Sequence, residues 1–400
     1  MPVIVQKYGG TSVSDPDKIR KVAGKIAATR RRGYDVVVVV SAMGHTTDDL
    51  LKMAKEIDPS PQRRELDMLM SVGERVSMSL LSMAIQKLGL EAISLTGSQS
   101  GIITNDSHTN ARIIEIRPYR IQDELERGRI VIVAGFQGVS YRKEITTLGR
   151  GGSDTTAVAL AAALSAECCE IFSDVDGVFS ADPNVVPAAR KIGELSYQEM
   201  QEMAEAGAKV LNAQAVEFAK KKGIVVYSKS THTDGSGTLI GRTVTDRAGQ
   251  VVGVAYEDDL VHLQAAGMPP AAMAQLLAFI DERRIGGKQL RVEQGPGGME
   301  LSLVVPLENV HDFDASRAAM ASRFGGAVTA TEGLGALSLI GDGINADNAN
   351  VRRLLELVRD AGVQARSVST SSFRITALVP AAALKALVAA CHKAFIEGNS

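Results

Sequence analysis

The sequence contains no tryptophan, only three cysteines, and few aromatic residues, which make up 4% of its 400 positions. A surplus of one charge is also lacking, because 44 Lys and Arg stand against 46 Asp and Glu, for a formal net charge of −2. Nucleic-acid binding needs extra cations to neutralise the phosphate backbone, so this balance predicts a protein that does not bind nucleic acid. It leaves open a local cationic site for a small anion.

The cysteines, Cys168, Cys169 and Cys391, do not have the spacing of a zinc-ligand pair. We expect Cys168 and Cys169 to be small buried hydrophobic residues, and three unpaired thiols favour a reducing compartment. The first residues have neither a basic region nor a long apolar run, and the apolar run at 36–40 is too short to cross a bilayer. We therefore predict a cytoplasmic protein without a membrane anchor.

The first half of the chain alternates β-branched runs with helical patterns, such as those at 17–32 and 153–166. This order predicts an α/β domain at 1–245, with a parallel-rich central sheet between helices. At 400 residues the chain is also too long for one core, which predicts more than one domain. The runs predicted as buried strands are 3–6, 36–40, 92–95, 130–134, 171–173 and 225–227.

A different composition begins after the glycine-rich stretch at 231–244, which we interpret as the exit from the first domain. A predicted helix at 270–283 precedes a strand at 299–305, and a second helix at 350–361 precedes a strand at 373–379. This weak internal duplication predicts two small α+β units within 246–400.

The stretch VQKYGGTSVS, residues 5–14, places Lys7, Gly9 and Gly10 at the end of a predicted strand. It is not a Walker loop, because the lysine precedes the glycines. Glycines at a strand end let main-chain N–H groups approach a phosphate, and Lys7 would add a positive charge beside it. A turn with a surface lysine explains this stretch equally well when it is taken alone.

The stretch TTLGRGGSDTTAVALAAAL, residues 146–164, joins a glycine-rich loop to a helix that is apolar almost all round. Such a helix is buried, so its N-terminus is expected at the carboxyl edge of the sheet, where ligands of such folds bind. Ser153 is the expected N-cap. Arg150 offers a forked donor for a carboxylate.

The stretch FSDVDGVFSADPN, residues 172–184, places Asp174 and Asp176 directly after a predicted strand. Two aspartates at a strand end are suited to hold a ribose or a metal ion. They are equally suited to form a turn, and the residues alone do not separate these interpretations.

In this order and at these spacings, the three loops resemble those of aspartate kinases of the amino acid kinase superfamily. KYGGTSV resembles the opening signature of that family, SVGERVS its glutamate helix, TLGRGGSDTTA its substrate loop and DVDGVFSADP its nucleotide loop. The C-terminal part resembles the paired ACT domains of those enzymes, at about 268–330 and 331–400, interleaved with 250–267. The resemblance implies phosphorylation of the side-chain carboxylate of L-aspartate by ATP to give 4-phospho-L-aspartate, the first step of lysine, threonine and methionine biosynthesis.

The resemblance also implies roles for individual residues. Lys7, Gly9 and Gly10 would hold the β- and γ-phosphates, and Lys209 would be the second lysine at the transferred group. Arg150 would bind the α-carboxylate of L-aspartate, and Glu74 with Asp154 would bind its ammonium. The residues that would position the reacting carboxylate are Ser41, Thr47 and Ser153. Those that would line the nucleotide pocket are Ser173, Asp174, Phe179 and Asp182.

Phosphoryl transfer to a carboxylate needs alignment and charge neutralisation and no general base, which agrees with these residue types. Mg²⁺ would bridge the phosphates and keep much of its water, so we expect no dedicated protein ligands for it.

Some positions depart from the family pattern. Phe179 stands where a tyrosine is usual and Asn184 where an arginine is usual, which predicts weaker ATP binding. The ACT turns depart further, at GMPPAAMAQLL, GKQLRVEQGPGG and GDGINADNANV. We therefore expect the ACT units to survive as a dimerisation element, with feedback by lysine or threonine weakened, altered or lost.

Two other hypotheses stay open at this point. One is a kinase of the same fold for another amino acid or for a nucleotide. The other is a non-catalytic amino-acid sensor that keeps the kinase fold as a platform.

Overall fold

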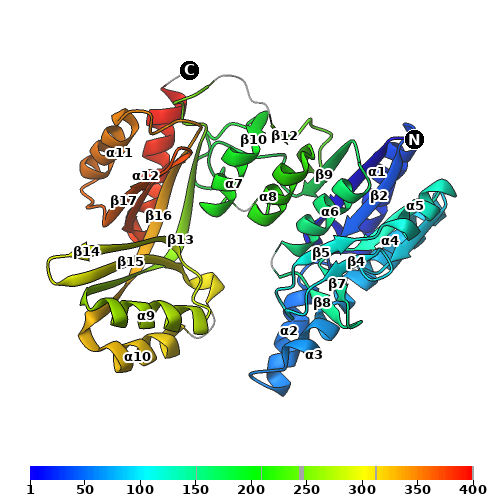
Figure 1. Cartoon of the computed structure of the whole chain (residues 1–400). Coiled ribbons are helices and arrows are strands. Elements are labelled where there is room, and N and C mark those ends of the chain that lie inside the picture. Colours follow the sequence, from blue (N-terminus) through cyan, green and yellow to red (C-terminus); the bar gives the residue numbers. More distant parts are fainter. Residues whose placement is uncertain (150, 209, 243–246, 311–312, 399–400) are drawn as a thin grey trace. The chain divides into compact units, whose positions relative to one another are not determined.

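The computed structural model describes residues 1–149, 151–208, 210–242, 247–310 and 313–398. The chain divides into two compact units (Figure 1). Unit 1 contains Met1–Phe179, Lys191–Glu205 and Lys209–Asp246, and unit 2 contains Ser180–Arg190, Ala206–Ala208 and Arg247–Ser400. The segment Ser180–Arg190, which includes the end of the predicted nucleotide loop, therefore packs with the C-terminal part of the chain.

Unit 1 is built on an eight-stranded sheet in the order β10-β12-β11-β9-β1-β2-β6-β3. All of its pairings are parallel except that of β11 with β12. β2 is buried along its whole length, as expected for a central strand covered on both faces. The α/β prediction is therefore confirmed. The strands are β1 (Val3–Tyr8), β2 (Asp35–Val40), β3 (Ala92–Leu95), β6 (Ile130–Ala134), β9 (Cys168–Ser173), β10 (Glu194–Ser196), β11 (Val226–Ser230) and β12 (Thr238–Gly241).

The helices of unit 1 follow from local signals at their ends. α1 (Pro16–Arg31) has proline at its first position and Asp15 as N-cap, whose side chain accepts a hydrogen bond from the Lys18 N–H. The remaining helices are α2 (Thr46–Ile57), α3 (Arg63–Met70), α4 (Val72–Lys87), α5 (Tyr119–Glu126), α6 (Gly152–Ala163), α7 (Tyr197–Glu205) and α8 (Ala213–Lys222).

One prediction about the start of a helix in this unit is wrong. Ser153 is not the N-cap of α6, because the helix begins at Gly152 and its N-cap is Gly151, in a left-handed conformation at φ +70°. Only glycine adopts that conformation without strain, so the turn is made by Gly151 and Ser153 enters the first helical turn. The stretch 231–244, interpreted as the exit from this domain, also contains the strand β12.

A second sheet of unit 1 was not predicted from the sequence. Its order is β5-β4-β7-β8, formed by β4 (Ile102–Thr104), β5 (Ile113–Ile116), β7 (Gln137–Ser140) and β8 (Ile145–Thr147). Its strands are only three or four residues long, too short to show a periodic pattern. β8 leads directly into the loop before α6, so this sheet sets where that loop begins.

Unit 2 contains an antiparallel sheet in the order β14-β15-β13-β16-β18-β17. Two long strands, β13 (Gly253–Met268) and β16 (Val328–Ile340), pair along their length. The other strands are β14 (Lys288–Gly295), β15 (Gly298–Pro306), β17 (Ser367–Thr370) and β18 (Arg374–Pro380), and the helices are α9 (Pro270–Glu282), α10 (Phe313–Phe324), α11 (Ala349–Asp360) and α12 (Ala381–His392). The α+β prediction for this part of the chain is confirmed.

Each end of the long strand pair has its own core. Val254 and Leu337 pack with α11 and α12, whereas Leu263 packs with α9 and α10. Figure 1 shows α9 and α10 beside β15, and α11 and α12 at the other end of the sheet. The first residues of β13 therefore share a core with the end of the chain.

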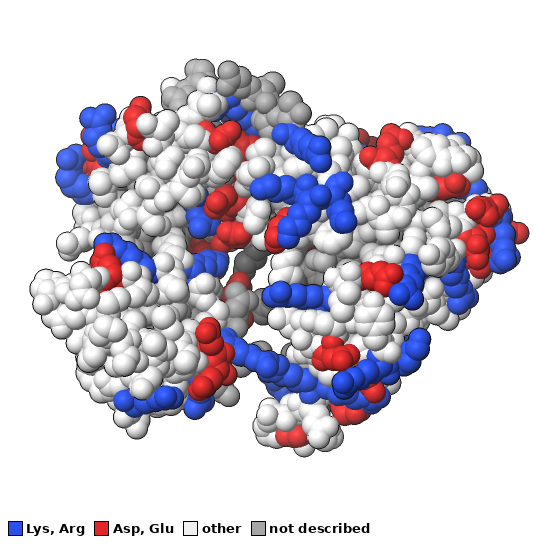
Figure 2. All heavy atoms as spheres, in the orientation of Figure 1, with Lys and Arg blue, Asp and Glu red and all other residues white. Residues whose placement is uncertain are grey.

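The stretch 63–87 is, among the described residues, long and apolar enough to cross a membrane by length and composition alone. Half of it is buried inside the protein, and the chain turns at Ser71 between α3 and α4. A core helix of a soluble protein passes the same test. Figure 2 shows acidic and basic side chains on the visible face of each unit.

Candidate active site

Lys7 and Asp154 form an ion pair at the carboxyl edge of the main sheet. Lys7 lies on β1, where its neighbour Tyr8 points to the opposite face and stacks on Phe172 at 4.7 Å between ring centroids. The Lys7 Nζ is 2.6 Å from Asp154 Oδ1, and the two side chains are only 12% and 11% exposed. Asp154 is in the first turn of α6, where the helix dipole favours a negative charge.

The two glycines after Lys7 have different structural roles. The N–H of Gly9 donates to the carbonyl of Phe172 at 3.2 Å, and a Cβ at Gly9 would lie 3.6 Å from Lys7 Nζ. A Cβ at Gly10 would lie 2.8 Å from the carbonyl oxygen of Ala42, closer than such atoms approach. Gly10 therefore permits close contact between β1's exit and the segment after β2, and Gly9 leaves space beside the lysine.

Glu74 has a carboxylate oxygen without a partner among the described residues. It lies on α4, and its Oε1 accepts a hydrogen bond from the Ala42 N–H at 3.2 Å, while its buried Oε2 accepts none from any described residue. Burial raises the pKa of Glu74 to about 7. A buried oxygen without a partner is rare in folded proteins and marks a place where a donor is expected to bind.

Ser41 and Thr47 lie on the same chain segment as Ala42, whose N–H donates to this carboxylate. Ser77 of α4 donates to the carbonyl of Ser41 at 2.7 Å, and the Ser41 N–H donates to the carbonyl of Tyr8 at 3.1 Å. Thr47 is half-buried in the first turn of α2. The end of β1, the end of β2 and α4 are thereby tied together at one edge of the sheet.

Ser153, in the first turn of α6, lies beside the carboxyl end of the next strand of the sheet, β6. A Cβ at Gly135 would come within 2.8 Å of the Ser153 Oγ, so the helix start and the strand end are in direct contact there. Arg150 and Lys209 lie outside the described residues. The described site residues that the structure brings to one edge are Lys7, Ser41, Glu74, Ser153 and Asp154.

The predicted nucleotide loop starts at the end of β9, beside β1. The Oγ of Ser173 accepts a hydrogen bond from the Val175 N–H at 3.2 Å, and Asp174 is exposed. Asp176 pairs with Lys191 at 3.0 Å, and Phe179 forms a β-bridge with the same lysine. No sequence signal indicates Lys191, because it lies 15 positions away from Asp176 and outside any motif.

Asp182 belongs to unit 2, and its carboxylate is already engaged there. Its Oδ1 accepts hydrogen bonds from the N–H and the side chain of Asn184 at 2.9 and 3.0 Å, and its Oδ2 accepts one from the Tyr256 hydroxyl at 3.1 Å. Nearby, the Ser180 Oγ lies 2.9 Å from Nε2 of the buried His392. The end of the predicted nucleotide loop is therefore anchored in the C-terminal unit.

The cysteines and possible metal ligands complete the description of reactive groups. Burial raises the pKa of the Cys168 thiol to about 12 and holds the pKa of the Cys169 thiol well above its ordinary value, so neither ionises near neutral pH. Both are buried, as predicted. No three His, Cys, Asp or Glu side chains converge as metal ligands in the part of the chain that the structure describes.

Comparison with known proteins shows the family to which this chain belongs. The model of the amino acid kinase family matches residues 2–228. The aspartokinase of Mycolicibacterium smegmatis is 42% identical over 411 residues, which span 100% of this chain and 97% of that protein. The aspartokinase of Mycobacterium tuberculosis is 43% identical over 412 residues, again across 100% of this chain and 97% of that protein.

A solved structure shares the fold along almost the whole chain. The crystal structure of E. coli aspartokinase III in complex with aspartate and ADP superposes with a TM-score of 0.85 at 24% identity, covering 98% of this chain and 99% of that one. From the sequence relationship and the fold together, the chain belongs to the amino acid kinase family and, within it, to the aspartokinases, which transfer a phosphoryl group from ATP to the side-chain carboxylate of aspartate.

Proposed function

We propose that Lys7 and Glu74 carry the two recognition tasks of this aspartokinase at the edge of the main sheet. Lys7 neutralises charge on the transferred phosphoryl group, and Lys209 adds a second cation. Glu74 accepts the ammonium of L-aspartate together with Asp154. The observation that carries the proposal is the open, buried Oε2 of Glu74, next to a main-chain segment that also contacts the exit of the lysine strand.

The remaining substrate contacts in this proposal are those that the resemblance to aspartate kinases implies. Arg150 binds the α-carboxylate, while Ser41, Thr47 and Ser153 hold the β-carboxylate in line with the γ-phosphate. One oxygen of that carboxylate forms a bond to phosphorus while the bond from phosphorus to the β,γ-bridging oxygen breaks, and ADP leaves. The nucleophile is already ionised, so no general base is needed.

ATP occupies the region after β9, lined by Gly9, Gly10, Ser173, Asp174 and Phe179. Mg²⁺ bound to the phosphates would supply charge neutralisation of the triphosphate. The ion pair between Lys7 and Asp154, at 2.6 Å, holds the lysine in place before the nucleotide binds. The resemblance also assigns Asp182 to nucleotide binding, and Tyr256 holds its carboxylate within unit 2.

The C-terminal unit supports a regulatory and dimerisation role. We propose a kinase domain at 1–245 followed by two ACT-like domains, and a cytoplasmic homo-oligomer in which the exposed strands of unit 2 pair between copies. The pathway is that of lysine, threonine and methionine. Feedback by lysine or threonine is weakened or altered, on the basis of the altered ACT turns. Inhibition by either amino acid below 1 mM, on the order of ordinary effector affinities, would refute weakened feedback.

The test of the whole proposal is a coupled assay of ADP release with L-aspartate, L-glutamate and other amino acids as acceptors. We expect turnover that depends on L-aspartate and on Mg²⁺. ADP release that is faster with another amino acid would favour a different acceptor. Absence of turnover, together with binding of an amino acid, would favour the sensor hypothesis.

A further inference from the structure

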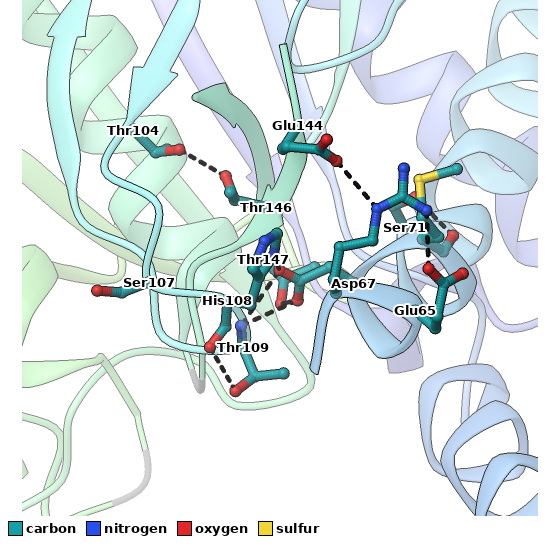
Figure 3. A network of polar contacts seen from close by, with 12 residues as sticks. Glu65, Asp67, Ser71, Thr104, Ser107, His108, Thr109, Glu144, Thr146 and Thr147 are labelled. Carbon is teal, nitrogen blue, oxygen red and sulfur yellow. Dashed lines mark hydrogen bonds and ion pairs between the residues drawn. The ribbon is translucent and has the colours of Figure 1, made fainter. Parts of the chain in front are cut away.

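Asp67 is fully buried in α3 of unit 1, and two other segments of the chain converge on its carboxylate. Its Oδ1 accepts hydrogen bonds from the Thr147 hydroxyl at 2.5 Å and the Thr109 N–H at 3.0 Å, and its Oδ2 lies 2.7 Å from His108 Nδ1 (Figure 3). A buried carboxylate costs free energy unless donors surround it, and here they do. No motif in the sequence indicates this residue.

The first consequence concerns the loop before α6. Thr147 is the last residue of β8, and its carbonyl accepts a hydrogen bond from the Ala111 N–H at 2.8 Å. A Cβ at Gly149 would lie 3.1 Å from Asn110 Oδ1 and 3.5 Å from the Thr109 carbonyl oxygen. The segment that Asp67 holds is therefore packed against the start of the loop that leads to α6.

The residues of that loop do little to restrict its backbone conformation. Gly149 and Gly151 both have left-handed φ angles, +78° and +70°, and glycine is the most conformationally free residue. Contacts from outside the loop must therefore fix the positions of these two glycines.

The second consequence concerns Glu74. The carbonyl of Asp67 accepts a hydrogen bond from the Ser71 N–H at 3.0 Å, and the Ser71 carbonyl accepts one from the Gln137 side chain at 2.8 Å. Ser71 directly precedes α4, whose first turn carries Glu74. One residue thus contacts both the beginning of the Glu74 helix and the beginning of the substrate loop.

We propose that Asp67 is a positioning residue for L-aspartate, which fixes the substrate loop relative to the helix that carries Glu74. The carboxylate and ammonium groups of the substrate are then bound at a fixed separation, and a small displacement of either site weakens binding of both. This inference rests on the proposed roles of Glu74 and Arg150.

The chain offers a matched pair of variants for the test. Thr146 and Thr147 are adjacent on β8 and both fully buried, but Thr147 donates to Asp67, whereas the Thr146 hydroxyl pairs with Thr104 at 2.5 Å (Figure 3). T147V and T146V remove the same group from the same strand. We expect T147V to raise KM for L-aspartate by about threefold to tenfold, the effect of one hydrogen bond to a charged group, with KM for ATP changed less than about twofold.

T146V is expected to leave both KM values within about twofold of the wild type, although both variants lose stability. D67N should raise KM for L-aspartate by about tenfold or more, with kcat at saturating L-aspartate largely retained. If D67N does not fold, the two threonine variants decide the question.

Three outcomes would overturn the inference. The first is a KM for L-aspartate in T147V no higher than in T146V. The second is an equal rise of KM for both substrates in T147V, which indicates general damage. The third is an unchanged KM for L-aspartate in the variant E74Q. That result would show that Glu74 is not the ammonium site, so it separates failure of the proposed function from failure of the role of Asp67.

Discussion

The β-sheets of the two units have different structural roles. In unit 1, parallel strands end at one edge, and residues as distant in sequence as Lys7 and Asp154 meet there. In unit 2, the antiparallel strands β13 and β16 contribute residues to two hydrophobic cores and so connect those cores. A parallel sheet concentrates chemistry in short loops, which leave motifs in the sequence, whereas long shared strands leave only a pattern of apolar residues.

The boundary between the units falls inside a motif. The sequence pattern predicts that DVDGVFSADP forms one loop, but Phe179 belongs to unit 1 and Ser180 to unit 2. The comparison therefore predicts that substitutions at the sheet edge of unit 1 affect chemistry, and that substitutions around Asp182 affect nucleotide binding through unit 2.

The largest expected effect is that of K7A, which removes the buried cation at the edge of the main sheet. We expect kcat to fall by roughly 100- to 1,000-fold, as for the loss of one charge-stabilising donor in other transfer reactions. The measurement is ADP release at saturating substrates. The matched control is K25A, because Lys25 pairs with the exposed Asp234 on the surface of the same unit. Full turnover in K7A would remove the lysine from the mechanism.

The second prediction uses the pKa of Glu74, which is about 7 instead of 4.5. The ionised form pairs with the ammonium, so kcat/KM for L-aspartate should rise up to pH 7 and then level off. E74Q should lower this value by roughly 10- to 100-fold and flatten the profile. A wild-type profile that stays flat between pH 5.5 and 8, on the order of one unit either side of that pKa, would contradict the assignment.

The same shift predicts an effect on stability with a definite sign. The folded protein binds this proton more tightly than the unfolded chain does, so stability is greatest below pH 4.5 and is lost as pH rises through 7. E74Q removes the buried charge and should be more stable than the wild type at pH 8, by about 3 kcal/mol at most. The gain should disappear at about pH 4.5. Urea unfolding at both pH values measures it.

The third prediction concerns close packing in unit 1. G10A places a Cβ 2.8 Å from the Ala42 carbonyl oxygen and should destabilise the protein by about 1–3 kcal/mol. G24A, in an exposed position of α1 with no atom within 4 Å of the new Cβ, should stabilise it by about 1 kcal/mol. Thermal unfolding of both variants tests the pair. Equal effects would show that the contact with Ala42 is not tight.

The smallest expected effect tests the link between Asp182 and unit 2. Y256F removes the hydroxyl that donates to Asp182 and should raise KM for ATP by about twofold to fivefold, with KM for L-aspartate unchanged. Y227F is the control, since no hydrogen bond of its hydroxyl is present among the described residues. If Y256F changes KM for L-aspartate instead, Asp182 does not line the nucleotide pocket.

How far the sequence predicts this molecule differs between strands and loops. The strands at 92–95 and 130–134 were predicted with their observed bounds. At 130–134 the reason is a continuous run of β-branched residues, which has few alternatives. The N-cap prediction at Ser153 was wrong, since the left-handed conformation of Gly151 ends the loop two residues earlier than the capping pattern suggests. The short sheet β5-β4-β7-β8 was missed because its strands carry too few residues for a pattern.

The sequence by itself determined the fold class, the family and the residues of the glycine loops, because these depend on local patterns and on motifs within a few positions. Only the tertiary structure decided that Glu74 has an open carboxylate oxygen, that Asp67 joins three segments, and that Asp182 is held by Tyr256. Each of these contacts joins residues separated by tens of positions. Whether a polar atom is satisfied or left open depends on what packing brings to it, and no local pattern records that.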